Sequence, residues 1–504
     1  MYRRSNSHQT IFDFHLPFGG KLSADNRWVV LTELIPWDKT ESEYAAIFED
    51  SDLGCPGKSA RVALGALIIK ERLGTTDRET VDQIRENPYL QYFLGFSAYT
   101  DKPPFHHTSM VHFRKRFGQK TLAQINELIV ANALNNQQEI SSDASDVPPE
   151  ADPPPPNQGK LIVDATCTPA DVTYPTDLKL LNEAREKTEE IIDRMHVPFI
   201  GTRQKPRTYR QKARMDYLAL AKQKKTGYRK IRKAIRKQLG YLNRNLKTIG
   251  DMASQGLLSN LDKRLYRLLL VSQELYRQQL WMYQNKYHSI EDRIVSLYQP
   301  HVRPIVRGKI KNPVEFGAKI SISLVDGFSF VDVLSWDAYN ESGDLKDQIE
   351  SYHRRYGYYP EAVLADKIYR TRKNRADCKE RGIRLSGPPL GRPKQITEST
   401  QKELQANKRQ QRQDEKDRIA VEGKFGQGKR RFTLDRIMAK LAETSEAVVM
   451  VSFIVMNLEK ILAGILLSLL HIWLEVYLSL GGAVRREDLA IRKPFGMASR
   501  HLLC

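Results

Sequence analysis

The pattern of hydrophobic and polar positions divides the chain into a helical first part and a mixed second part. Across residues 60–134, apolar residues recur at the three- and four-residue spacing of amphipathic helices. Thr76 and Glu79 have the spacing of a helix-capping box, and Thr108 or Ser109 is placed to cap a short basic helix. These elements predict either a helix-turn-helix arrangement or a plain helical bundle with solvated charges, and the pattern leaves both open.

The second part alternates between strand and helix patterns. An apolar run typical of a buried strand, "LIVD", ends on Asp164. The stretch "VEFGAKISISLVDGFSFVDVLSWD" alternates apolar and polar residues around Asp326-Gly327, which predicts a hairpin. After an amphipathic helix, the short strand "VLAD" ends on Asp366, and helix, strand and helix follow. This order predicts an α/β layered domain with a mixed sheet.

Two segments interrupt this order. Residues 135–160 are polar, acidic and proline-rich, which predicts a disordered linker. Residues 178–300 are polar and helical in pattern, which predicts a helical insertion after the first strand of the domain. We therefore expect a helical N-terminal domain over 1–134 for DNA binding or assembly, the linker, an α/β domain over 161–480 that contains the insertion, and a tail over 481–504.

Charge is the most unusual feature of the composition. The 504 residues carry a net charge of +20, and residues 203–249 alone contain seventeen Lys and Arg against one acid, which gives +16. A charge so large and so clustered predicts a polyanionic partner, with nucleic acid ahead of an anionic membrane. The basic residues expected to contact DNA phosphates in the insertion are Lys224, Lys225, Arg229, Lys230, Arg232 and Lys233. Those expected to do so on the short N-terminal helix are Arg114, Lys115 and Arg116.

The four cysteines lie far apart, without the pairing of a zinc site or a disulfide framework, so a reduced cytoplasmic protein is expected. The first residues lack the apolar core of a signal peptide. Residues 461–480 have the length of a membrane span but contain His471 and Glu475, and a charge inside a span is costly. We expect a buried core helix there and no membrane partner.

The two strand-terminal aspartates suggest a site. A single aspartate after a strand is most often a turn or helix-cap residue. Two in one basic domain favour a metal site instead, because carboxylate oxygens suit Mg²⁺ or Mn²⁺ and strand ends collect sites in α/β sheets. A pair of such ions stabilises both the attacking and the leaving oxygen of a phosphodiester displacement. Glu422, on a predicted helix with Arg418 four residues before it and Lys429 seven after it, is the third candidate ligand.

These motifs resemble those of the DDE-class transposases of bacterial insertion sequences, in the broad group of IS-four and IS-five-like families. The pattern around the catalytic glutamate of that family is Y-x2-R-x3-E-x6-K, and this chain has Arg418, Glu422 and Lys429 at those positions, with Glu415 in place of the tyrosine. The two aspartate motifs resemble "IVDAT" and "LADKIY", and the helical pattern before the linker resembles the N-terminal domain of IS-five-like members. The resemblance covers about residues 60–134, 160–180 and 314–460.

The resemblance implies a ribonuclease-H-like mixed sheet with flanking helices, with Asp164 on the first strand, Asp366 after a later strand and Glu422 on a helix. It implies a transposase, an endonuclease that binds transposon ends and target in double-stranded DNA and catalyses strand cleavage and strand transfer. The three acids would be catalytic and would hold two Mg²⁺ or Mn²⁺ ions. A homodimer on DNA, at the nucleoid in the bacterial cytoplasm, is expected. The further residues expected to contact DNA are Arg418, Lys424, Lys429, Arg430, Arg431 and Tyr369.

Three other interpretations stay open at this point. A metal-dependent nuclease on the same fold would use the same acids to cut without joining. A DNA-binding protein that has lost catalysis would show decay of an acid, whereas all three acids are present. A membrane protein with a basic cytoplasmic region is the third.

Overall fold

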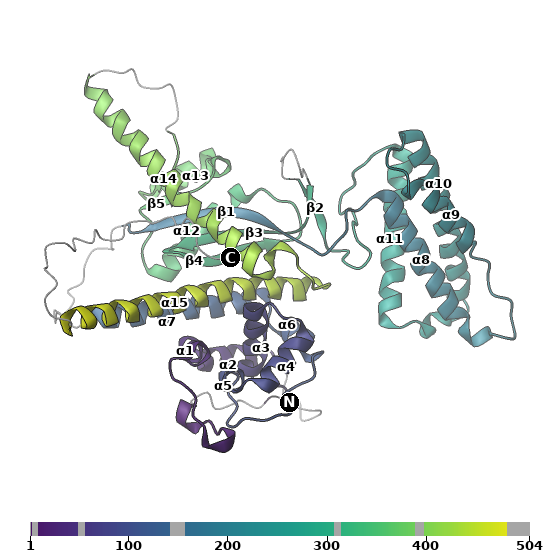
Figure 1. Ribbon diagram of the computed structural model, residues 1–504. Coiled ribbons are helices and arrows are strands. Elements are labelled where there is room, and N and C mark those ends of the chain that lie inside the picture. The colour runs from purple at the N-terminus through teal and green to yellow at the C-terminus, as the bar shows by residue number, and fades with distance from the viewer. Residues whose placement is uncertain are drawn as a thin grey trace. The chain divides into compact units, whose positions relative to one another are not determined.

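Figure 1 shows the computed structural model of the chain, which describes residue 2 and residues 9–48, 56–141, 157–306, 314–388 and 398–480. The chain divides into two compact units, residues 1–458 and 459–504. The elements that position the candidate site all belong to the first unit.

The N-terminal part is helical, as predicted. Thr76 caps its helix by accepting a hydrogen bond from the Glu79 backbone N–H at 3.2 Å, and Thr108 occupies the cap position of the short basic helix. The helices are α1 (Arg27–Leu34), α2 (Trp37–Ala45), α3 (Ala60–Leu73), α4 (Asp77–Glu86), α5 (Pro88–Phe93), α6 (Ser109–Arg116) and α7 (Gln119–Ser141).

The predicted linker begins too early. Helix α7 continues to Ser141 through the sequence "NNQQEIS", in which Gln and Glu favour a helix. The prediction of a disordered linker from residue 135 is therefore corrected. Residues 142–156, where the prolines are concentrated, lie outside the described residues.

Buried polar side chains connect the N-terminal helices to the rest of the first unit. The Asn457 Nδ2 donates to Asn126 Oδ1 on α7 at 2.9 Å and to the backbone oxygen of Ser329 at 2.8 Å. On α3, the Glu71 carboxylate accepts from the Thr433 backbone N–H at 2.9 Å. Because buried polar groups are costly without partners, these contacts fix the N-terminal helices against the α/β elements.

The sheet is mixed. Its strands are β1 (Lys160–Pro169), β2 (Arg303–Val306), β3 (Val314–Val325), β4 (Phe328–Ser335), β5 (Ala362–Leu364) and β6 (Arg384–Leu385). They are ordered β2-β3-β1-β5-β6, with β4 also paired to β3. The β1–β3, β2–β3 and β3–β4 pairs are antiparallel, and the β1–β5 and β5–β6 pairs are parallel. The mixed α/β architecture predicted from the sequence is confirmed.

The predicted hairpin is also confirmed. Val325 pairs with Phe328, and Asp326 and Gly327 between them have φ of 48° and 78°. Two central residues with positive φ define the type I′ turn, whose twist matches that of the flanking strands, and Asp-Gly is a favoured sequence for it.

The first strand is longer than predicted. It does not end at Asp164, which pairs with Ile322 of β3, but continues to Pro169. The physical reason is that residues 165–168, two of which are Thr, pair with the long neighbouring strand as far as Ala318. The second aspartate behaves nearly as predicted, because Asp366 lies two residues after the end of β5 and caps the 3₁₀ turn Lys367–Tyr369.

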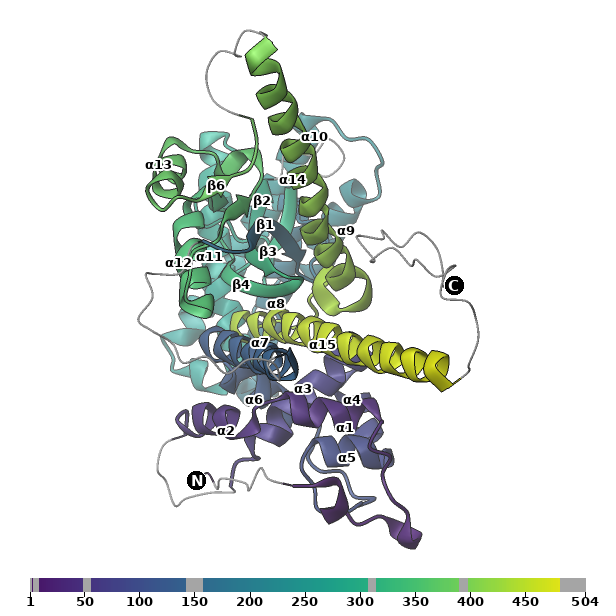
Figure 2. The ribbon, with the colours of Figure 1, turned by 90° about the vertical axis from the view of Figure 1, so that its left-hand side faces the viewer.

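Three helices accompany the sheet. They are α12 (Leu345–Tyr356), α13 (Arg372–Glu380) and α14 (Glu398–Arg431), with α12 and α13 on one side of the strands and α14 on the other (Figure 2). Leu161 and Val163 of β1 form a core with Ile349 and Tyr352 of α12. Helix α14 begins at Glu398 and therefore carries several turns before Glu422.

Helix α15 (Ala442–Leu480) is apolar along most of its length. The stretch Ala442–Ser468 is long and apolar enough to cross a membrane by length and composition, and two thirds of its most apolar window is buried within the protein. Val449, Phe453 and Ile454 belong to this buried part. Residues 461–480 are helical, but the prediction of a buried core helix is correct only at its start: Ile461 and Leu462 are buried, whereas Leu466 and Leu467 are 57% and 66% exposed.

The predicted helical insertion is present between β1 and β2. Its helices are α8 (Asp177–His196), α9 (Arg210–Ala221), α10 (Tyr228–Ala253) and α11 (Lys263–Asn285). Leu181 and Ile192 of α8 pack with Leu242 of α10 and Leu275 of α11 in its apolar core. These helices therefore form a bundle with a hydrophobic core of its own.

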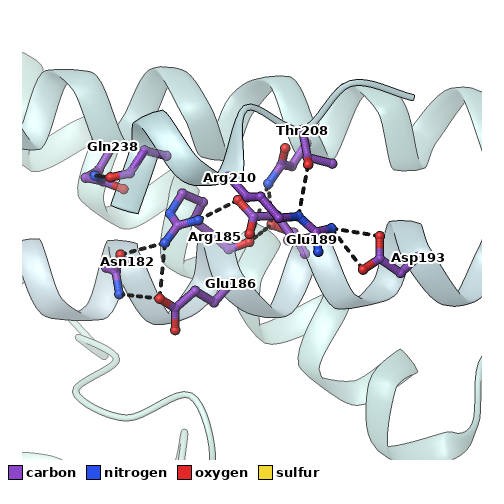
Figure 3. Close-up of polar contacts among 11 residues, drawn as sticks. Asn182, Arg185, Glu186, Glu189, Asp193, Thr208, Arg210 and Gln238 are labelled. Atoms are coloured by element: carbon purple, nitrogen blue, oxygen red, sulfur yellow. Dashed lines mark hydrogen bonds and ion pairs between the residues drawn. The ribbon is translucent and has the colours of Figure 1, made fainter. Parts of the chain in front are cut away.

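One buried ion pair runs along α8 in this bundle (Figure 3). The Arg185 guanidinium, 1% exposed, pairs with Glu189, which is 7% exposed. It also donates to Asn182 Oδ1 at 2.8 Å and to the more exposed Glu186 at 3.1 Å. By contrast, Arg210 pairs with Asp193 at the surface.

We expect Arg185→Met to destabilise the bundle by about 3–5 kcal/mol, because the substitution leaves the Glu189 carboxylate buried without its partner. Arg210→Met is the matched control, since it removes an exposed pair worth about 0–1 kcal/mol. Hydrogen-exchange protection of α8 and α10 measures the difference. The double variant Arg185→Met/Glu189→Leu should recover most of the loss. Equal effects of the two single variants would contradict this account.

Candidate active site

The alternation of β1 places Asp164 on the face of the strand that meets α14. Leu161 and Val163 are fully buried in the core with α12. Successive side chains of a strand point to opposite faces, so Asp164 and Thr166 lie on the other face. Contacts from Lys160 and Thr166 to α14 bear this out.

Helix α14 runs beside β1 in the same direction. The Lys160 Nζ lies 2.7 Å from Asp417 Oδ2, and Lys429 Nζ donates to Thr166 Oγ1 at 3.2 Å. Asp417 and Lys429 are about 18 Å apart along the helix, and Lys160 and Thr166 are about 20 Å apart along the strand. The two distances match, as expected for a helix and a strand that run side by side. Glu422 lies on α14 between these two contacts, as Asp164 does on β1.

The parallel pairing of β1 with β5 brings the two aspartates to adjacent strands. The last paired position joins Ile162 to Leu364. Asp164 lies two residues after Ile162, and Asp366 lies two residues after Leu364. The two aspartates are therefore at equivalent positions along neighbouring strands. Asp366 is more than half exposed, and its Oδ1 accepts from the Lys367 backbone N–H at 2.7 Å.

The pKa of Asp164 depends on the other two acids as well as on burial. Burial raises the pKa of its carboxyl above the ordinary value. The hydrogen bond that Ala165 N–H donates to it at 2.8 Å and the charge of Arg418 lower this pKa. The charges of Asp366 and Glu422 raise it. The three predicted acids therefore share one electrostatic neighbourhood, although they come from distant parts of the sequence.

Arg418 is the cation of this neighbourhood. It precedes Glu422 by one turn of α14, and its guanidinium Nη1 lies 3.7 Å from Asp366 Oδ1. Its Nε is buried without a hydrogen-bond partner among the described residues. The side chain is thus oriented into the space beside the acids rather than into solvent.

The donor chemistry of the site fits a hard divalent cation. Asp164, Asp366 and Glu422 offer carboxylate oxygens, the ligands that Mg²⁺ and Mn²⁺ prefer. Among the described residues, no group of three or more His, Cys, Asp or Glu is close enough to form a ready metal-binding cluster. In this arrangement the Asp366 carboxylate is paired with Arg418 instead.

The basic residues predicted to contact DNA on α14 follow the acids along the helix. Lys424 donates to the Gly327 backbone oxygen at 3.2 Å, and Lys429 contacts Thr166. Arg430 and Arg431 are exposed at the end of the helix. These positions give a basic edge to the site.

Two predicted DNA contacts are corrected by the structure. Tyr369 is 0% exposed and packs in the core with α12, because it is the apolar residue that closes the turn after Asp366. Arg114 is buried and pairs with Asp77, with its Nη1 2.9 Å from Oδ1. Tyr369 is fully buried and Arg114 is 7% exposed, so this conformation presents neither side chain to DNA.

Two further predicted contacts are engaged within the fold. The Arg116 Nη1 lies 3.2 Å from the Tyr44 hydroxyl, and Arg232 donates to the Tyr283 backbone oxygen at 2.9 Å. The remaining predicted DNA contacts of the insertion and of α6 are exposed: Lys224, Lys225, Arg229, Lys230, Lys233 and Lys115.

Two segments of the chain are similar to known families. Residues 363–459 match the family Transposase DDE domain, and residues 17–116 match the family Transposase domain (DUF772). These two segments are similar to transposase domains, and the second of them to the DDE domain. The predicted resemblance is therefore confirmed. The DDE domain match includes Asp366 and Glu422, whereas Asp164 lies before it.

One curated relative is also similar to part of this chain. It is the "Uncharacterized protein ORF8 in nfe locus" from Rhizobium meliloti, which is 27% identical over 156 residues, or 31% of this chain and 68% of that protein. No solved structure was found to match the chain.

Proposed function

We propose that this protein binds the ends of a transposon in double-stranded DNA and catalyses metal-dependent strand cleavage and strand transfer. The observation that carries the proposal is the shared neighbourhood of Asp164 on β1, Asp366 after β5 and Glu422 on α14, the last two within the Transposase DDE domain match. The mixed sheet supports a ribonuclease-H-like core, with β1 antiparallel to β3, parallel to β5 and bearing the first acid.

In this proposal Asp164, Asp366 and Glu422 hold two Mg²⁺ or Mn²⁺ ions. Such ions, when bound, stabilise the attacking and leaving oxygens of an in-line phosphodiester displacement. Arg418, which now pairs with Asp366, would turn to a DNA phosphate, and the basic residues at the end of α14 would hold the backbone beside it. The protein would act as a homodimer on DNA in the bacterial cytoplasm.

Strand transfer is the step that separates this proposal from a nuclease with the same acids. We expect the purified chain, given Mg²⁺ and pre-cut ends taken from the DNA that flanks its gene, to join the 3′ ends to a target plasmid. Sequencing the junctions measures joining, and the Asp164→Asn variant is the control for a contaminating activity. Cutting without junctions would favour the nuclease, and DNA binding without either product would favour an inactive binding protein.

A further inference from the structure

A pocket lies at one end of the insertion bundle, where α8 and α10 begin and α11 ends. We call it the bundle-end pocket; it has a volume of about 310 Å³, and its lining includes Tyr228, Arg232, Tyr283, Lys286, Tyr287 and Arg293. The volume is at the lower end of the range for sites that take a small organic group. The size suits one flat ring system and its substituents.

Aromatic rings at this pocket are left open to solvent. Tyr228 is 54% exposed and Tyr287 is 61% exposed. Trp281 stacks on Tyr287 with ring centres 5.7 Å apart and an angle of 13° between the planes. Lys286 before it adopts the left-handed conformation, with φ of 59°, which is uncommon for a residue other than glycine. Such a conformation ends α11 and brings Tyr287 to the pocket, so the rings are presented by a constrained turn.

Positive side chains lie at the N-terminal, positive end of the α10 dipole, beside the pocket. Helix α10 begins after Gly227, which supplies no side-chain cap, and Arg229 and Lys230 stand in its first turn without an acid. Cations at the positive end of a helix are unfavourable, whereas an anion there is stabilised. Arg232 adds its guanidinium over the Tyr283 ring, 4.1 Å from the ring centre. The pocket entrance is therefore prepared for an anion.

The acid in the pocket lining is already neutralised. Asp177 Oδ1 accepts from Arg293 Nη2 at 2.7 Å and from Gln279 Nε2 at 2.9 Å. The pocket thus offers open aromatic faces and positive charge in the same small volume.

We propose that the bundle-end pocket binds one unpaired nucleotide of a DNA strand, with its base against the exposed tyrosines and its phosphate at the start of α10. A nucleotide joins a flat ring to an anion, which is the pairing of groups that the pocket complements. A base inside a duplex is covered by its neighbours and cannot enter such a pocket, so the site selects single-stranded DNA. This inference rests on the proposed function, because it assigns the insertion a role in holding the DNA substrate.

Equilibrium binding without metal tests the pocket separately from cleavage. The probes are a fluorescein-labelled oligothymidylate strand and a labelled duplex, each titrated with the full chain in EDTA and followed by anisotropy. We expect Tyr228→Ala/Tyr287→Ala to weaken single-strand binding by about tenfold or more and to leave duplex binding unchanged. The variant Tyr228→Phe/Tyr287→Phe keeps both rings and should bind as the parent does.

Tyr266→Ala is the matched control, because Tyr266 is a similarly exposed tyrosine near the start of α11 and lies outside the pocket lining. Its single-strand affinity should equal that of the parent. Unchanged single-strand binding in the double alanine variant, or an equal loss for the duplex, would overturn the pocket assignment while leaving the proposed function standing. A parent chain that binds neither probe would overturn both.

Discussion

Replacing Asp164 by asparagine should lower Mg²⁺-dependent DNA cleavage by at least about a thousandfold, because removing one member of a catalytic set removes most of its effect. Asp366→Asn and Glu422→Gln should each do the same. These substitutions keep the shape of the side chain and remove the charge that a divalent ion needs. DNA affinity should stay close to that of the parent, because binding depends on contacts from Lys and Arg to phosphates.

The measurement pairs a cleavage rate with a binding isotherm for each variant. Glu415→Gln is the matched control, since Glu415 is an exposed acid on the same helix, seven residues before Glu422. It should cleave at the parent rate. If a variant of one of the three acids cleaves as fast as the control, that acid is not a metal ligand, and the shared neighbourhood has another purpose.

The parts of the site that the sequence predicted depend on local patterns. The turn at Asp326-Gly327 follows from the positive φ that these residues tolerate, and it fixes the register of β3 and β4. Helical spacing places Arg418 one turn before Glu422 without any tertiary information. The closeness of Asp164 and Asp366 required only that their strands be parallel neighbours.

The predictions that were wrong concern residues whose partners are far away in the sequence. Arg114 is withdrawn from the surface by Asp77, thirty-seven residues earlier, and Tyr369 is withdrawn by the core that α12 forms. Strand β1 passes Asp164 because β3, more than a hundred residues later, continues to pair with it. The hydrophobic periodicity of the sequence does not predict contacts between such distant residues.

The bundle-end pocket was missed for a similar reason. Its lining comes from the ends of three helices, so its tyrosines are scattered between Tyr228 and Tyr287. A signal was present in the interleaving of tyrosines with Lys and Arg, which is typical of surfaces that bind single-stranded nucleic acid. The pattern was interpreted for its charge alone.

The basic residues at the start of α10 should dominate the salt dependence of duplex binding. Five of the six residues predicted to contact phosphates there are exposed. The sixth, Arg232, donates to the Tyr283 backbone oxygen and lies over the Tyr283 ring, so it is not counted as a phosphate contact. Each phosphate contact contributes about −0.9 to the slope of log K against log salt concentration. Changing Lys224, Lys225, Arg229, Lys230 and Lys233 to Gln should flatten that slope by up to about 4.5.

A matched control removes charge from the other end of the same bundle. Lys263, Arg264 and Arg267 are exposed at the start of α11, about 18–24 Å along this helix from Gln279, where the pocket lining on α11 begins. Changing these three residues to Gln should alter the slope less for each charge removed. Slopes are measured by anisotropy on one duplex over a series of KCl concentrations. A phosphate that loses its protein contact keeps its counterion, so the removal of a real contact must flatten the slope. Equal slopes in the parent and the five-residue variant would therefore mean that these charges only solvate the helix.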